Sequence, residues 1–141
     1  MKPTHHVVIS GGVGLVLTFW IHSWLAGLTC FLSGILIDID HYLDFYLVKK
    51  KLPARYKELT DFCDRNNKDR GKLYLIFHAY EFLIVLWLAI SYWHLNELWL
   101  GLAVGLSQHL FCDQLTNPFR PLAYFLIYRL KYGFQKEYIF V

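Results

Sequence analysis

Two long stretches of this chain contain no lysine or arginine, and they constrain its fold more than any other feature. They cover residues 3–48 and residues 73–119. Hydrophobic residues make up 56% of the chain, against roughly 45–50% in soluble globular domains. Each stretch has room for two membrane-spanning helices, because one span needs about 20 residues. The sequence therefore predicts an all-α, polytopic membrane protein.

The apolar runs and the turns between them predict one helical membrane domain over residues 1–141 with four transmembrane helices. The spans are expected at about residues 6–20, 25–46, 73–93 and 98–116. The first run lacks a convincing small-x-small cleavage site and continues through Trp24, so we expect a retained helix rather than a signal peptide. A loop at residues 47–72 separates the second and third spans, and residues 54–66 within it are expected to form an amphipathic surface helix.

The distribution of positive charge predicts the orientation of these helices. With four spans, all 14 Lys and Arg fall on the side that holds both termini and the 47–72 loop. The positive-inside rule makes that side cytoplasmic, so we expect a protein integral to the prokaryotic inner membrane. The loop is expected to contact anionic lipid. No nucleic acid partner is expected, because the net charge is only +3 and no nucleic-acid-binding motif accompanies the basic run.

The tail, residues 119–141, combines aromatic and basic side chains and predicts a helix that lies in the membrane interface. Arg120, Arg129 and Lys131 belong to it. We expect these three residues to anchor the tail at the membrane surface rather than to bind a phosphate.

Titratable side chains gather near one end of each predicted span. They are His5 and His6 in the first, Asp38, Asp40 and His41 in the second, His78 and Glu81 in the third, and His109 and Asp113 in the fourth. With the predicted topology, all four groups reach a similar depth near the cytoplasmic face. Charged groups at membrane depth are costly and point to function. A shared functional centre explains their common depth better than four independent polar contacts do.

The residue types and their spacing favour a metal site, because imidazoles and carboxylates are the usual ligands of Zn and similar divalent ions. Residues three or four apart share a helix face. This spacing relates Asp38 to His41, His78 to Glu81, and His109 to Asp113. Paired ligands on facing helices are a known way to hold metals inside a bundle. The predicted ligands are His6, Asp38, Asp40, His41, His78, His109 and Asp113, with His5 left open as the alternative to His6.

Asp40 does not fit this pattern, since it points away from Asp38 and His41 on a straight helix. Either the helix loosens at Asp40, or Asp40 acts as a bridge or as a partner that orients another ligand. Asp40 and Glu81 are also the predicted general bases, because a carboxylate beside an activated water can take its proton.

Four sequence elements resemble membrane-bound metal-dependent hydrolases, an uncharacterised family related in motif to zinc-dependent phospholipase C. The elements are Thr4-His5-His6, Asp38-Ile39-Asp40-His41, His78-Ala79-Tyr80-Glu81 and Ser107-Gln108-His109-Leu110-Phe111-Cys112-Asp113. The third departs from the His-Arg-x-x-x-His pattern usual in that family, because it has only His78, with Glu81 nearby, and lacks the arginine. The resemblance implies metal-dependent hydrolysis, and a site at headgroup level implies a phosphoester of a lipid or other amphiphile as substrate.

Two other classes of function stay open from the sequence. A non-enzymatic assembly or scaffold protein could use the polar groups, or a structural metal, to lock its helices together. A metal-ion transporter is less favoured, because it needs polar groups across the membrane depth and the outer halves of these helices are almost wholly apolar.

Overall fold

The computed structural model describes residues 3–64 and 71–141, so residues 65–70 of the predicted loop lie outside the described residues. All regular elements in the described ranges are helices, accompanied by two isolated β-bridges. The chain divides into two compact units. Unit 1 comprises the residues up to Ile37 together with Tyr80–Asn117, and unit 2 comprises Asp38–Ala79 and Pro118–Val141.

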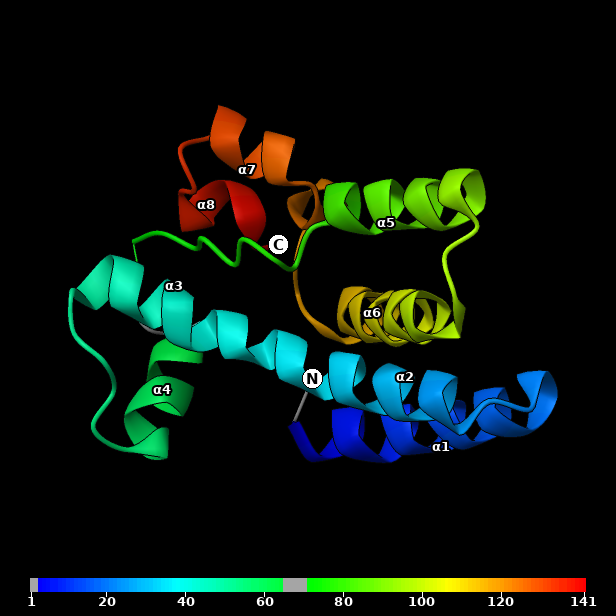
Figure 1. The fold of residues 1–141 in the computed structure, drawn as a ribbon. Helices are drawn as coiled ribbons and strands as arrows, with labels where there is room; N and C mark the ends of the chain where they lie inside the picture. The colour runs from blue at the N-terminus through cyan, green and yellow to red at the C-terminus, as the bar shows by residue number, and fades with distance from the viewer. Residues whose placement is uncertain (1–2, 65–70) are drawn as a thin grey trace. The chain divides into compact units, whose positions relative to one another are not determined.

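Unit 1 comprises four helices rich in apolar residues, and Figure 1 shows their paths. They are α1 (Pro3–Ile21), α2 (Trp24–Leu36), α5 (Tyr80–Trp93) and α6 (Glu97–Thr116). The turn between α1 and α2 contains His22 with a left-handed φ of 52°, and Ser23 then caps α2 by accepting a hydrogen bond from the Ala26 amide at 3.3 Å.

The interior of unit 1 is lined by small and polar residues, and large apolar side chains cover its outside. Ala26, Cys30 and Ala103 are fully buried. Gly101 and Gly105 of α6 pack directly on the backbone of α2. Exposed apolar side chains include Val8, Leu15, Val16 and Phe19 on α1 and Ile84, Val85 and Leu88 on α5. This inverted distribution is typical of helices that pack through small residues and face lipid.

Two helices are long and apolar enough to cross a membrane: Pro3–Ile21, and the continuous helical stretch Trp24–Lys49. These correspond to the first two predicted spans. The third predicted span is shortened, because α5 begins at Tyr80 and has 14 residues. The fourth corresponds to α6, which has 20 residues but carries polar side chains in its second half. Two of the four predicted spans are therefore both long enough and apolar enough to cross a membrane.

A 3₁₀ turn, η1 (Ile37–Ile39), separates α2 from α3 (Asp40–Lys49). The helix therefore departs from α-helical geometry immediately before Asp40, but through a more tightly wound turn and not through the loosening that was one of the two possibilities raised by the sequence. Short 3₁₀ stretches within helices often accompany functional sites or hinges. Here the turn changes the helical phase, so that neighbouring polar residues take different directions.

In unit 2, the amphipathic helix predicted within the loop is α4 (Tyr56–Cys63). It packs on α3 through Phe45, Leu59 and Phe62. The Phe45 and Phe62 rings meet edge to face with centroids 5.0 Å apart. These apolar contacts hold α4 against α3 in unit 2.

Glu58 at the start of α4 closes the loop that follows α3. Its carboxylate accepts hydrogen bonds from Lys51 at 2.6 Å and from the Ala54 amide at 2.9 Å, and the Lys51 contact is the main reason its pKa is lowered. Stability from this contact is present above the ordinary pKa of glutamate and is lost as pH falls through the lowered pKa.

We expect Lys51→Met to raise the Glu58 pKa, measured by NMR titration. Lys57→Met is the control, because it leaves the hydrogen bonds of Glu58 intact.

The remaining part of unit 2 is irregular chain held by the C-terminal segment. Residues 71–79 form no helix, so the predicted third span is wrong over its first turns. Their partners are η2 (Pro121–Tyr124), α7 (Leu126–Lys131) and α8 (Lys136–Ile139). Leu73, Leu75, Ala123 and Ile139 form a shared core, and the Leu73 amide donates to the Phe134 carbonyl at 2.8 Å. The tail is thus three short elements within unit 2 rather than the single helix that was predicted.

Candidate metal-binding clusters

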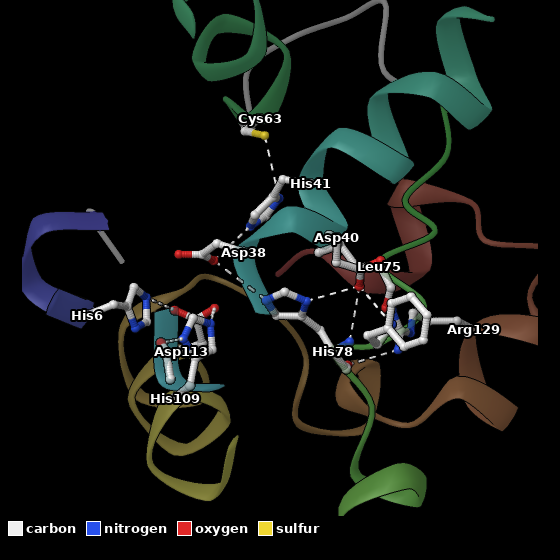
Figure 2. Close-up of polar contacts among 12 residues, drawn as sticks. His6, Asp38, Asp40, His41, Cys63, Leu75, His78, His109, Asp113 and Arg129 are labelled. Carbon is white, nitrogen blue, oxygen red and sulfur yellow. Dashed lines mark hydrogen bonds and ion pairs between the residues drawn. The ribbon is translucent and has the colours of Figure 1, made fainter. Parts of the chain in front are cut away.

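Unit 2 brings Asp38, His41 and His78 together, and we call these residues the His78 cluster (Figure 2). One potential ligand atom from each lies within 4.8 Å of the others. Asp38 Oδ1 is 3.6 Å from His41 Nε2 and 3.8 Å from His78 Nε2. His78 is buried, whereas the Asp38 and His41 side chains are 24% and 27% exposed. The cluster therefore combines a fixed inner ligand with two that remain reachable.

Asp40 orients His78. Its Oδ2 atom accepts hydrogen bonds from the backbone amides of Phe77 and His78, at 2.7 and 3.2 Å, and lies 3.1 Å from His78 Nδ1. The Asp40 carboxylate is 3% exposed. An imidazole that donates its Nδ1 proton to a carboxylate presents the lone pair of Nε2, the arrangement usual for a metal ligand. Asp40 thus takes the orienting role that the sequence left as one of its alternatives.

The two ring nitrogens of His41 also face two different side chains. Its Nδ1 atom lies 3.6 Å from the Cys63 sulfur of α4, while Nε2 faces Asp38. Sequence reasoning missed Cys63 as a partner, because nothing in the spacing relates position 63 to position 41. Only the packing of α4 on α3 brings them together.

Unit 1 brings His6 of α1 together with His109 and Asp113 of α6, and we call these the His6 cluster. His6 Nε2 is 3.1 Å from Asp113 Oδ1, and His109 Nε2 is 3.6 Å from Asp113 Oδ2. The two imidazole rings stack with centroids 3.8 Å apart. His109 Nδ1 lies 2.8 Å from the Gly34 carbonyl oxygen, so His109 also turns Nε2 toward its carboxylate.

The structure places the two N-terminal histidines in different surroundings. His5 is exposed and His6 is buried, because α1 turns position 6 toward α6. The Nδ1 atom of His6 is buried and has no hydrogen-bond partner among the described residues. His6 is therefore the candidate ligand of this pair.

Glu81 lies half-buried in the first turn of α5, in unit 1. The predicted i,i+3 relation with His78 does not hold on a helix, because α5 begins at Tyr80, after His78. Residues 71–79, which precede α5, form no helix, so α5 does not extend back to His78.

The donor atoms of both clusters are of the kinds that bind divalent metal ions, and those of the His78 cluster also lie close enough together to hold one. Imidazole nitrogen and carboxylate oxygen suit Zn and other first-row divalent ions. Three of the histidines have Nδ1 beside a hydrogen-bonding group and Nε2 beside a carboxylate. A buried polar atom without a hydrogen-bond partner, such as His6 Nδ1, is costly unless another group satisfies it. Buried His and Asp groups of this protein could therefore hold a metal, although the donor set does not identify which one.

No family model, curated protein or solved structure matches this chain. Its function must therefore be inferred from the chemistry of the two clusters.

Proposed function

We propose that this chain is a membrane-embedded, metal-dependent hydrolase that acts on a phosphoester of a lipid or other amphiphile at the cytoplasmic face. The observation that carries the proposal is the arrangement of the His78 cluster. His41 and His78 each present Nε2 toward Asp38, and each has its Nδ1 beside a further side chain. Histidines that bind a metal almost always make such an Nδ1 contact as well, and this contact fixes the direction of Nε2.

Asp38, His41 and His78 would hold a Zn-like ion in unit 2, and His6, His109 and Asp113 would do so in unit 1. A divalent ion of this kind supplies a Lewis acid for a phosphoryl oxygen and an acidified water near neutral pH. Asp40 uses Oδ2 to hold His78, and its buried Oδ1 has no hydrogen-bond partner among the described residues. Asp40 Oδ1 is thus a candidate to take a proton in unit 2, and Glu81 remains the second candidate base.

The membrane setting determines the proposed class of substrate. The exposed apolar surface of unit 1 and its two long apolar helices support a chain embedded in lipid. Four spans, with both termini and the basic loop in the cytoplasm, remain part of the proposal. Asp38 and His41 are partly exposed, so an amphiphile with its phosphate at headgroup level is the substrate we expect.

A structural role is the competing proposal, and the His6 cluster favours it. His6, His109 and Asp113 are at most 4% exposed and contact one another. A polar cluster of this kind could lock α1 to α6 without catalysis, as an assembly or scaffold protein requires.

Metal content of the detergent-purified protein tests the hydrolase proposal. We expect wild-type protein to retain about one divalent ion or more per chain by elemental analysis. His41→Ala should lose the ion of the His78 cluster, and with it the phosphodiesterase activity on phospholipid vesicles. His5→Ala is the matched control, because its side chain is exposed, and it should match wild type. Wild-type protein that binds no metal even after incubation with Zn²⁺ would exclude the hydrolase and leave the structural role.

A further inference from the structure

Arg129 of α7 is buried, although its position in a basic, aromatic tail predicted a surface role. It is 1% exposed. Its guanidinium donates hydrogen bonds to three backbone carbonyls, those of Tyr74 at 2.6 Å, Leu75, and His78 at 2.9 Å. A planar guanidinium with five N–H groups can hold several acceptors at once, which an ammonium cannot do in the same geometry. Arg129 therefore binds one short stretch of chain at several points (Figure 2).

The amide groups of the same stretch are bound by carboxylates of α3. The Tyr74 amide donates to Asp44 at 2.7 Å, and the Phe77 and His78 amides donate to Asp40. Both carboxylates are buried. Peptide N–H groups thus face anions while nearby peptide C=O groups face a cation. Each charge is compensated by oriented peptide dipoles, which makes its burial tolerable.

Hydrogen bonds that Asp40, Asp44 and Arg129 make with the backbone replace regular secondary structure in residues 73–79. No helix or strand fixes the backbone there, and Leu75 has a left-handed φ of 35°. A leucine rarely adopts that conformation unless its surroundings impose it. The position of the His78 backbone therefore depends on Asp40 from α3 and on Arg129 from α7.

We propose that Arg129 is a positioning residue for His78, and that the C-terminal segment is consequently part of the His78 cluster. This inference rests on the proposed metal binding by that cluster. Asp40 sets the direction of the His78 ring through Nδ1, and Arg129 sets the place of the His78 carbonyl and of the turn before it. Loss of either contact displaces Nε2 from Asp38, so the affinity for metal falls. Removing an interaction that supports a ligand typically lowers metal affinity about 10- to 100-fold.

Zn²⁺ titration of the purified full chain tests this inference, with Arg129→Met, Arg129→Lys and Lys131→Met compared with wild type. Lys131 is the matched control, because it lies on the same helix and carries the same charge but is exposed. We measure the binding step that His78→Ala removes. Arg129→Met should weaken that step about 10- to 100-fold, Arg129→Lys should weaken it less, and Lys131→Met should leave it unchanged.

Amide hydrogen exchange of the metal-free proteins separates positioning from unfolding. Arg129→Met should speed exchange at residues 73–79 and leave α3 and α4 protected as in wild type. Faster exchange with unchanged Zn²⁺ affinity overturns the inference, because Arg129 then only stabilises the chain. If Arg129→Met also speeds exchange in α3 and α4, Arg129→Lys is used for the comparison instead. Arg129→Lys with wild-type Zn²⁺ affinity but faster exchange at residues 73–79 would then overturn the inference. A wild-type protein without a Zn²⁺ step instead overturns the proposed function.

Discussion

Replacing Asp40 by alanine is expected to destabilise unit 2 by about 3–5 kcal/mol and to weaken metal binding about 10- to 100-fold. The Asp40 carboxylate is buried and accepts the amides of Phe77 and His78 as well as contacting the His78 ring. Alanine leaves these donors buried without an acceptor, and each such loss costs about 1–3 kcal/mol. The sum is less than additive, because residues 73–79 can relax together.

The measurement for Asp40→Ala must report on unit 2 specifically. All five tryptophans lie at positions 20, 24, 87, 93 and 99, inside unit 1, so their fluorescence does not follow unit 2. Hydrogen exchange at residues 73–79 supplies the stability, and Zn²⁺ titration supplies the affinity. Asp61→Ala on α4 is the control, because Asp61 is exposed and such changes usually stay within about 0.5 kcal/mol. Equal protection in the two variants would contradict the role given to Asp40.

Replacing Gly105 by leucine is expected to destabilise unit 1 by about 3 kcal/mol, at the upper end of overpacking effects. A Cβ atom at Gly105 would overlap the Ser33 hydroxyl and the Cys30 carbonyl oxygen of α2. The hydroxyl can rotate away, but the carbonyl belongs to helix backbone and cannot. The helices must therefore separate along their closest contact, and the loss of packing outweighs the roughly 1 kcal/mol of helix propensity gained on replacing glycine.

Tryptophan fluorescence during denaturant unfolding in detergent measures this effect, since every tryptophan belongs to unit 1. Gly12→Leu is the matched control, because a Cβ at Gly12 of α1 meets nothing within 4 Å. It makes the same change in an apolar helix, and it should leave stability equal or slightly higher. If Gly12→Leu and Gly105→Leu unfold at the same denaturant concentration, close packing between α2 and α6 is not what holds unit 1 together.

Local sequence patterns were sufficient to predict most of the helices. Apolar runs without Lys or Arg predicted α1, the continuous helical stretch Trp24–Lys49 and α6 within a few residues, and the amphipathic stretch after Pro53 predicted α4. These elements depend on neighbouring residues along the chain, through hydrophobic length and helical spacing. The same patterns predicted that His109 and Asp113 share a face, and their contact in α6 confirms it.

Residues 73–79 show where local patterns fail. Leu73-Tyr74-Leu75-Ile76-Phe77 continues the apolar run of α5, so nothing nearby in the sequence predicts that the helix begins only at Tyr80. Asp40, Asp44 and Arg129 compete for the backbone groups of this stretch, and they come from distant positions. Their hydrogen bonds to peptide groups replace those that a helix would make.

The sequence by itself determined which chemical groups this protein offers. Its uninterrupted apolar runs require burial or lipid, and its His and Asp residues near the helix ends supply metal-binding donors. Only the tertiary structure decided how those donors are used. The path of α1 selected His6 over His5, and the 3₁₀ turn before Asp40 allowed that carboxylate to hold His78 instead of joining Asp38. Arg129, which composition placed at the surface, became a buried partner of the same segment. Such choices depend on which distant groups satisfy one another once water is excluded, and no local pattern encodes that.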